Sequence, residues 1–338
     1  MRVALDGRLT RQMSVGMKTY TRELVARLPR VASDLEFVTF TKGGNFGWAE
    51  QVELPRSIRQ ARVGLTHFLS LYAPLAAPRP YIITVHDLIH LRFPQYFKTK
   101  VGPYYQTAVR FICARAERVI TDDVRTVDDL ERFLGVKRQR VRVVALGIQE
   151  RFLAPIAPYG ADRPYVLYVG NHRPHKDLQT LFDAWAGLPE DLAVDLYVTG
   201  KDDFGDGLER YNGRGRRIVA LGDVSDSQLP GYYAGAAVLA HPALCEGFGL
   251  PLLEAMACRV PVVVCADAVP AELSRDSLTF PARDVRALRA QLLRVLSDAG
   301  LARSLGNSGR ALAERLTWDR CAKETADVYR EVLEEMTR

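Results

Sequence analysis

Two kinds of segment alternate along the chain. Short apolar runs of the length of buried strands are followed by longer segments whose apolar residues recur at helical spacing. In the first part of the chain the predicted strands are Arg2–Leu5, Leu35–Phe40, Leu65–Phe68, Tyr81–Val85, Val119–Thr121 and Val141–Val144. This alternation is typical of a parallel sheet that is covered by helices on both faces.

The alternation is interrupted once and then resumes. Residues 153–163 are rich in proline and glycine and predict a linker. Apolar residues from Trp318 to Met336 recur at helical spacing and predict a terminal helix. Between these segments the predicted strands are Tyr165–Val169, Leu192–Thr199, Arg217–Leu221, Ala237–Ala240 and Val260–Val264.

The length agrees with a division into two parts, because 338 residues exceed the size at which one hydrophobic core usually stops growing. We predict an α/β protein with Rossmann-like domains at 1–155 and 156–317. Residues 318–338 are expected to form a helix that packs across the boundary and returns to the first domain. Ligands of such sheets bind beyond the carboxyl ends of the strands, so the loops there are the candidates for chemistry.

Composition and charge narrow the class of protein. No window approaches the ~20 apolar residues of a membrane span, so we expect a cytoplasmic protein. The five cysteines form no C-x-x-C pair and are expected to be reduced and structural. A net charge of +6 suits anionic partners, but the basic residues are interspersed with 40 acidic ones, which does not favour nucleic acid.

The segment with the most specific chemistry is Glu246-Gly-Phe-Gly-Leu-Pro-Leu-Leu-Glu254, which follows a predicted strand and turns into a helix. A helix N-terminus offers unpaired N–H groups to phosphate oxygens, and glycines let a ligand approach the backbone. Carboxylates beside it can accept hydrogen bonds from sugar hydroxyls. The alternative is that Glu254 is only a favourable first-turn acid and Glu246 a solvated loop residue.

With Pro242 and Pro261-Val-Val-Val around it, this segment resembles the E-x7-E signature of glycosyltransferase family 4, retaining enzymes of the GT-B fold. The resemblance covers most of the chain and implies two sheets facing a central cleft. It implies that Glu246 contacts the transferred sugar and that Glu254 binds the ribose diol. The amides around Gly247, Phe248, Gly249 and Leu250 would hold the diphosphate or the sugar.

A second matching segment, Val169-Gly-Asn-His-Arg-Pro-His-Lys-Asp-Leu178, passes from a strand end through a tight loop into a helix. Loss of a nucleoside diphosphate leaves negative charge on phosphate oxygen, which a positioned ammonium or guanidinium stabilises without a metal. Lys176 and Arg173 are the candidates. Many relatives place the arginine directly after the glycine, where this chain has Asn171.

Three further segments resemble family elements. His86 ends the strand-like run Tyr81-Ile-Ile-Thr-Val, and the matching family position contacts the donor sugar, often at carbon six; a structural histidine bonded to a carboxylate is the alternative. Gly16 opens a predicted helix where acceptor and diphosphate would approach the backbone, although it can equally be ordinary loop punctuation. The backbone around Val224 would pair with the nucleobase. Asp123 stands where the family usually has serine.

Acidic pairs at Asp122-Asp123, Asp128-Asp129 and Asp202-Asp203 raise the possibility of a metal site. We expect no metal and no cofactor, because the helix terminus and the Lys/Arg candidates already supply positive charge. The chain has neither a P-loop nor a G-x-G-x-x-G after its first strand, so NTPase and dehydrogenase fingerprints are missing. The basic and aromatic segment 92–118 either rests on anionic lipid or is a partly buried helix with a solvated basic face.

The resemblance, together with these features, implies a retaining hexosyltransferase with catalytic residues His86, Lys176 and Glu246. The donor is expected to be a nucleotide sugar, GDP-mannose ahead of UDP-sugars. The acceptor is expected to be a saccharide or lipid-linked saccharide of surface polysaccharide synthesis, handled in the cytoplasm or at the inner face of the membrane. A sugar-nucleotide epimerase or hydrolase of the same fold, and a non-catalytic glycan-binding subunit, are the alternatives.

Overall fold

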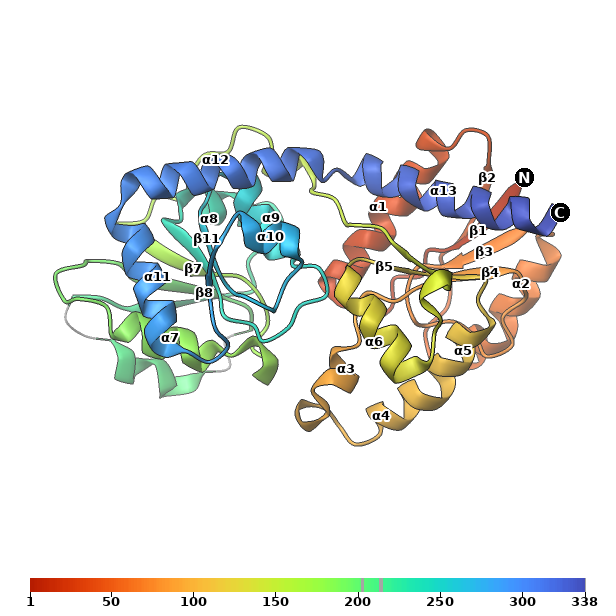
Figure 1. Ribbon diagram of the computed structural model, residues 1–338, viewed down its shortest axis with the longest axis horizontal. Helices are drawn as coiled ribbons and strands as arrows, with labels where there is room; N and C mark the ends of the chain where they lie inside the picture. The colour runs from red at the N-terminus through yellow and green to blue at the C-terminus, as the bar shows by residue number, and fades with distance from the viewer. Residues whose placement is uncertain (202–203, 213–214, 338) are drawn as a thin grey trace. The chain divides into compact units, whose positions relative to one another are not determined.

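The computed structural model of the protein describes residues 1–201, 204–212 and 215–337. The chain divides into two compact units, Met1–Gly147 with Leu316–Arg338, and Ile148–Arg315. Each is a parallel six-stranded sheet with helices, which confirms the predicted class (Figure 1). Segment 153–163, the expected linker, lies within the second unit, where the Tyr159 amide donates to the Gly231 carbonyl at 2.8 Å.

The sheet of the first unit has the strand order β2-β1-β3-β4-β5-β6, with all neighbours parallel. Its strands are β1 (Arg2–Asp6), β2 (Glu36–Phe40), β3 (Leu65–Phe68), β4 (Tyr81–Thr84), β5 (Arg118–Thr121) and β6 (Val141–Val143). Its helices are α1 (Val15–Val31), α2 (Leu54–Gln60), α3 (Ile89–Arg92), α4 (Val101–Tyr104), α5 (Arg110–Arg115), α6 (Val124–Leu134) and α13 (Trp318–Thr337). The predicted strands agree with these within a few residues.

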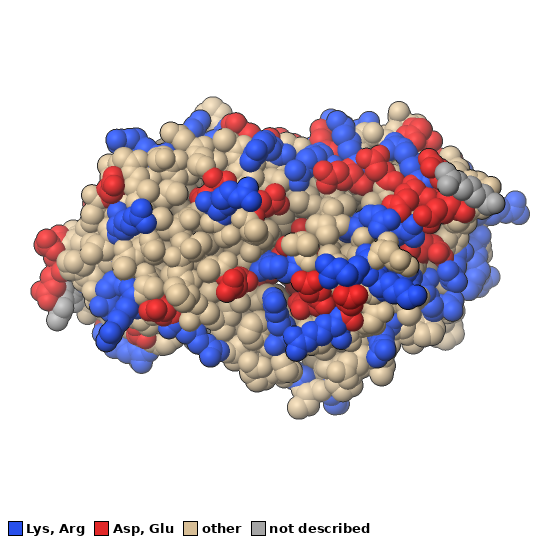
Figure 2. All heavy atoms as spheres, viewed as in Figure 1, with Lys and Arg blue, Asp and Glu red and all other residues tan. Residues whose placement is uncertain are grey.

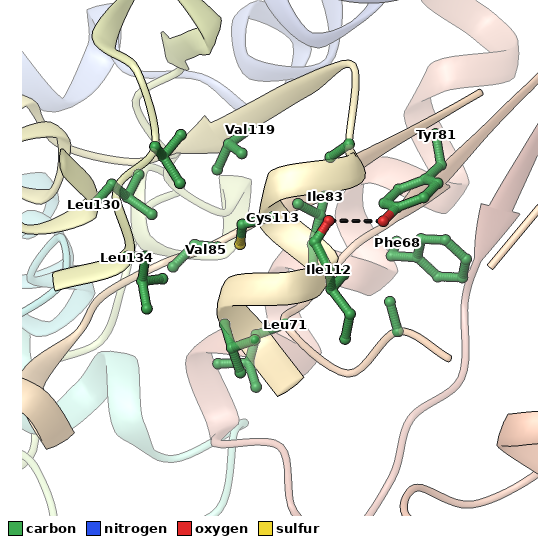
Figure 3. Packing of buried hydrophobic residues seen from close by; sticks show 14 of the residues in the cluster. Phe68, Leu71, Tyr81, Ile83, Val85, Ile112, Cys113, Val119, Leu130 and Leu134 are labelled. Atoms are coloured by element: carbon green, nitrogen blue, oxygen red, sulfur yellow. Dashed lines mark hydrogen bonds between the residues drawn. The ribbon is translucent and has the colours of Figure 1, made fainter. Parts of the chain in front are cut away.

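The core of this unit is formed by alternating strand residues and the inner faces of the helices. Figure 3 shows Ile83 and Val119 of the sheet facing Ile112 and Cys113 of α5. The Tyr81 hydroxyl donates to the Ile112 carbonyl at 2.7 Å, so its polar end is satisfied inside the core. All five cysteines lie in the described part of the chain and none forms a disulfide.

Helix α13 belongs to the first unit and buries one face there. Trp318 and Tyr329 are almost fully buried, and the Tyr329 hydroxyl lies 2.6 Å from Nδ1 of His67. The other nitrogen of His67 bonds Thr84 at 2.8 Å. Burial lowers the pKa of His67 to about 3, so this ring is a neutral structural bridge between β3, β4 and α13.

Gly147 lies against the backbone at the start of α13, and this contact gives a stability prediction. A Cβ at position 147 would come within 2.1 Å of the Trp318 nitrogen, which is backbone and cannot rotate away. Gly147→Ala is therefore expected to lower the free energy of unfolding by about 1–3 kcal/mol or more. Denaturant unfolding measures this. Gly102→Ala in α4, where nothing lies within 4 Å, should be neutral or slightly stabilising; equal effects of the two changes would contradict the contact.

The sheet of the second unit has the strand order β12-β11-β10-β7-β8-β9. Its strands are β7 (Tyr165–Tyr168), β8 (Asp195–Thr199), β9 (Ile218–Gly222), β10 (Val238–His241), β11 (Val262–Cys265) and β12 (Leu278–Phe280). Its helices are α7 (Leu178–Ala186), α8 (Leu229–Gly235), α9 (Leu250–Ala257), α10 (Ala271–Arg275), α11 (Val285–Ser297) and α12 (Ala299–Arg315). The short edge strand β12 was not predicted from the sequence.

The strand order fixes where ligands have room. In each sheet the strands that come directly after the first strand of the unit add on one side of it, and the later strands add on its other side. The order reverses between β1 and β3 in the first unit and between β7 and β10 in the second. Loops leaving two such strands diverge at the carboxyl edge and leave a crevice between them. No helix among the described residues is long and apolar enough to cross a membrane.

Candidate functional site

The two segments singled out around Lys176 and Glu246 follow the two strands at the switch point of the second sheet. Residues 169–177 leave β7 and residues 242–249 leave β10, and these strands are paired neighbours. The Leu244 amide donates to the His175 carbonyl at 2.8 Å, which ties the two loops together. The switch point therefore brings together residues 70 positions apart in sequence.

At the centre of this site Glu246 accepts from two basic groups on one oxygen. The Lys176 ammonium donates to Oε1, and Nε2 of His241 lies 2.6 Å from the same oxygen. The Lys176 and Glu246 side chains are 11% and 12% exposed, and His241 is fully buried. Burial alone would raise the pKa of Glu246, but the Lys176 charge and the His241 ring hold the pKa well below its usual range. Glu246 is therefore ionised at neutral pH.

Helix α9 starts beside this pair. Gly249 caps the helix with φ of +101°, a left-handed conformation that side chains disfavour, so glycine is required there. The Phe248 side chain is buried, which leaves its backbone as the part that can meet a ligand. Gly247 and Leu250 are half-buried. The geometry agrees with an anion site made of backbone amides at a helix N-terminus.

The second carboxylate of the motif has the opposite electrostatic character. Glu254 accepts a hydrogen bond from the buried Tyr233 hydroxyl at 2.8 Å. Burial raises the pKa of Glu254 to about 7, although the Tyr233 bond and the charge of Arg151 oppose the shift. One carboxylate of the motif is thus firmly ionised, and the other is poised near neutrality.

Two other donor candidates, Arg173 and Val224, lie on loops that follow strands of the same sheet. Arg173 is exposed, and its amide donates to the Asn171 side chain at 3.2 Å. Val224 is half-buried in the loop after β9, two strands from β7. Its backbone is placed at the carboxyl edge of the same sheet.

In the first unit His86 follows β4 and is held by a buried carboxylate. Its Nδ1 lies 2.6 Å from Oδ2 of Asp122, and its ring meets the edge of Tyr20 at 4.7 Å. Burial would lower the pKa of His86, but Asp122 raises it above the ordinary value. The other nitrogen, Nε2, is buried and forms no hydrogen bond of ordinary geometry in the described residues, although the Leu69 carbonyl contributes to the raised pKa.

This arrangement predicts the effect of removing the carboxylate. Asp122→Asn should lower the pKa of the His86 ring, because burial is then no longer opposed by the full charge of residue 122. An NMR titration of the His86 ring measures this. In the wild type the protonated ring should persist above the ordinary pKa, and its stabilising contribution should be lost as pH rises through the raised value. An unchanged titration in the variant would contradict the pairing.

Two other sequence candidates have clear structural surroundings. Gly16 lies in the first turn of α1, whose cap Ser14 accepts from the Met17 amide at 3.3 Å. Asp123 caps α6, accepts from the Arg125 amide at 3.3 Å and pairs with the Arg125 side chain. Serine and aspartate are both good N-caps, so the departure at 123 keeps the helix start.

The acidic pairs are engaged by basic side chains where they are described. Asp122 is paired with His86, and Asp128 with Arg138. Asp123 pairs with Arg125, and Asp129 lies 3.9 Å from Arg92. The pair at 202 and 203 lies outside the described residues. Within residues 1–201, 204–212 and 215–337 no group of three or more potential ligands could hold a metal ion.

The basic and aromatic segment 92–118 is partly core. Tyr105 is buried and Tyr104 half-buried, whereas Phe111 is 47% exposed with the Arg115 guanidinium 5.3 Å from its ring centre. Figure 2 shows basic and acidic side chains interspersed over the displayed face of the molecule.

Sequence reasoning missed three residues of the site. His241 and Tyr168 end the two switch-point strands, and their rings lie nearly parallel 6.3 Å apart beside Glu246. Tyr233 supports Glu254. His241 could have been identified from the sequence. Like His86, it stands at the carboxyl end of an apolar strand, and a glycine-rich motif follows it. Nothing in the sequence pairs Tyr233 with Glu254, since 21 positions separate them.

Two family models match the chain. The model described as Glycosyltransferase Family 4 matches residues 18–152, and the model described as Glycosyl transferases group 1 matches residues 163–298. Together they cover most of the sequence.

Named relatives and solved structures agree with this match. The chain is 27% identical to O-antigen chain mannosyltransferase B of Escherichia coli over 81% of its length and 76% of that protein. It is 28% identical to D-inositol 3-phosphate glycosyltransferase of Streptomyces bingchenggensis over 66% of the chain, but it spans only 54% of that protein. Sucrose-phosphate synthase of Thermosynechococcus elongatus has a similar fold, with a TM-score of 0.76 at 22% identity and 99% coverage of both chains.

Proposed function

Because the chain belongs to the family 4, group 1 glycosyltransferases of the GT-B fold, we propose that it transfers a hexose from a nucleotide sugar, with GDP-mannose as donor. One observation carries the proposal: Lys176, Glu246 and the N-terminus of α9 meet at the switch point of one sheet, with Glu254 on the same helix. This set supplies positive charge for a diphosphate and carboxylates for hydroxyl groups.

In the proposed complex the amides at Gly247 to Leu250 and the Lys176 ammonium bind the diphosphate. Glu254 accepts hydrogen bonds from the ribose hydroxyls, and the backbone near Val224 meets the base. Glu246 binds hydroxyls of the transferred sugar, with His241 and Lys176 holding it ionised. His86, fixed through Nδ1 by Asp122, is proposed to contact the donor sugar. Arg173 is a second cation for the diphosphate.

The proposed reaction forms a bond from an acceptor oxygen to the anomeric carbon and breaks the bond from that carbon to phosphate oxygen. Attack occurs on the face that the phosphate leaves, so configuration is retained. The acceptor proton passes to the departing phosphate oxygen, and Lys176 stabilises the negative charge that develops there. No metal or cofactor has a part in this scheme.

The preference for mannose rests on the similarity to the Escherichia coli mannosyltransferase, with UDP-sugars as the second candidate. That relative's name concerns an O-antigen chain, so the proposed acceptor is a saccharide or lipid-linked saccharide of surface polysaccharide. The proposed place of action is the cytoplasm, at the inner face of a membrane where the acceptor is lipid-linked. Segment 92–118 would supply peripheral contact with anionic lipid there, through its exposed Phe111 and basic residues.

The test is a proton NMR time course with GDP-mannose or UDP-glucose and a panel of methyl glycosides and lipid-linked saccharides. The proposal expects GDP-mannose to be consumed and the first new anomeric signal to have the α configuration. A β product would contradict retention. Release of free mannose with every acceptor would favour the hydrolase alternative, and no consumption of either donor would contradict the activity.

A further inference from the structure

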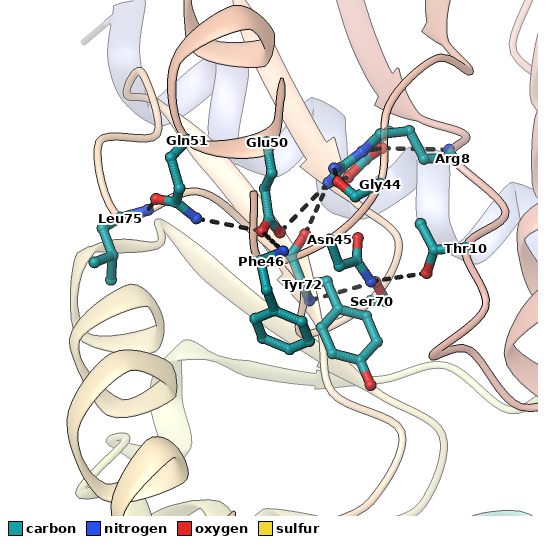
Figure 4. Close-up of polar contacts among 11 residues, drawn as sticks. Arg8, Thr10, Gly44, Asn45, Phe46, Glu50, Gln51, Ser70, Tyr72 and Leu75 are labelled. Carbon is teal, nitrogen blue, oxygen red and sulfur yellow. Dashed lines mark hydrogen bonds and ion pairs between the residues drawn. The ribbon is translucent and has the colours of Figure 1, made fainter. Parts of the chain in front are cut away.

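Three loops at the carboxyl edge of the first sheet are joined by a buried guanidinium. Arg8, just after β1, is 3% exposed and binds both carboxylate oxygens of Asp6 at 2.7 Å. It also donates to the carbonyls of Gly44, after β2, and Tyr72, after β3, both at 3.0 Å. These strands flank the switch point, so Arg8 holds the loops where a ligand of this sheet would bind (Figure 4).

A buried carboxylate completes this network from the other side. Glu50 is 2% exposed, and its Oε1 lies 3.8 Å from the Arg8 guanidinium. Its Oε2 accepts the backbone N–H of Phe46 and the Gln51 side-chain amide. Gln51 in turn accepts the Leu75 amide at 3.0 Å. Charges of this kind are costly to bury unless they are paired and hydrogen-bonded. Because the Phe46 N–H donates to Glu50, the same network fixes the backbone at Phe46.

Phe46 itself combines a strained backbone with an exposed ring. Its φ is +61°, a left-handed conformation that bulky side chains rarely adopt, and it is 55% exposed. The ring meets those of Tyr72 and Tyr104 edge-on, at 5.5 and 5.4 Å. Figure 4 shows the Phe46 and Tyr72 rings next to each other beside the network. Backbone strain of this kind persists only where the surroundings impose it, and it is commonest at functional sites.

These features select one kind of occupant. A ring that only filled the core would be buried, and a ring that only inserted into lipid would need no strained, ionically fixed backbone. A fixed, exposed ring at a switch-point edge suits a ligand of defined shape. The C–H face of a pyranose is apolar and carries a small positive charge, which the negative face of an aromatic ring attracts.

We propose that Phe46, with Tyr72 beside it, is a stacking platform for the acceptor saccharide, and that Arg8 and Glu50 are its positioning residues. This inference rests on the proposed glycosyltransferase function and names a part of the acceptor site. Phe46 lies after β2, apart from the Gly16 and His86 segments that sequence analysis connected with the acceptor and the sugar.

Ligand-observed saturation-transfer NMR tests the proposal, with methyl α-mannoside, methyl α-glucoside and mannobiose as probes and GDP present. The wild type and Phe46→Tyr should transfer saturation to ring C–H protons of at least one probe. Phe46→Ala and Phe46→Gly should weaken binding roughly tenfold, the effect of losing one good stacking contact. Phe46→Gly also removes the backbone strain, so its melting temperature should equal or exceed that of the wild type. A structural role alone would not give that combination.

Trp48→Ala is the matched control, because Trp48 is in the same loop, 72% exposed, and has an ordinary φ of −53°. It should leave saccharide binding unchanged. Equal binding in Phe46→Gly and the wild type, or no probe binding to the wild type, would each overturn the platform. Thermal stabilisation by GDP and by UDP is recorded in parallel. Stabilisation without saccharide binding defeats this inference alone, and stabilisation by neither nucleotide defeats the proposed function.

Discussion

Replacing Lys176 with alanine is expected to lower kcat by about 10²–10³-fold, the usual effect of removing one group that stabilises developing charge. The same change removes one of the two basic groups that meet Oε1 of Glu246, and His241 stays against that oxygen. The free energy of unfolding should therefore fall by about 3–5 kcal/mol at neutral pH. Because the pKa of Glu246 is depressed, the contribution of the pair is present above its ordinary pKa and is lost as pH falls through the lower folded value.

Two companion variants separate catalysis from stability. Glu246→Gln in the Lys176→Ala background removes the uncompensated charge, so stability should recover while activity stays low. Lys176→Arg keeps a cation at the site and should retain more activity than alanine, although its planar fork differs from an ammonium. Single-turnover rates and denaturant unfolding are the measurements. Near-wild-type turnover in Lys176→Ala would remove the lysine from the mechanism.

Glu254→Gln should make the protein more stable and a poorer nucleotide binder. Because the pKa of Glu254 is raised to about 7, its half-buried carboxylate is charged at pH 8, although its surroundings favour the neutral form. A shift of this size corresponds to at most about 3 kcal/mol, so a gain of about 1–3 kcal/mol is expected at pH 8. The folded pKa is raised, so wild-type stability falls as pH rises from about 4.5 to 7, and the advantage of the variant should vanish near pH 5.

Loss of binding should accompany this gain. A carboxylate that accepts from ribose hydroxyls contributes more than an amide, so affinity for GDP should drop at least about tenfold. Wild-type affinity should also strengthen as pH rises through 7, where Glu254 ionises. Calorimetric titration at several pH values tests both statements, and Tyr233→Phe serves as a control that removes only the supporting hydroxyl. A variant that binds GDP normally would exclude Glu254 from the ribose site.

The sequence was sufficient for the fold because hydrophobic periodicity carries it. Runs such as Val262–Cys265 are long enough and apolar enough to predict a buried parallel strand, whereas β12 was not predicted. The packing of segment 153–163 on α8 escaped prediction because proline and glycine report turn tendency, not tertiary contacts. Tyr159 stacks on Tyr232 there at 4.3 Å, through an aromatic pair 73 residues apart that no local pattern encodes.

In the candidate site, too, local motifs could be predicted from the sequence and tertiary contacts could not. Glu246, Lys176 and Gly249 could be named because each belongs to a short motif with its own chemical logic. The sharing of one Glu246 oxygen by Lys176 and His241 depends on the strand order, which places β7 beside β10. The opposite pKa shifts of Glu246 and Glu254 depend on burial and on partners, so sequence could give the two carboxylates but not their different protonation.

Calorimetric titration of the intact protein with GDP, UDP and ADP in the presence of EDTA tests the central claim most directly, with Glu254→Ala and Lys176→Ala beside the wild type. GDP should bind selectively in the presence of EDTA, its binding should be lost in Glu254→Ala, and it should be weakened in Lys176→Ala. Failure of every nucleotide to bind, a requirement for added divalent metal, or equal binding by both variants would contradict a metal-independent donor site built from these residues.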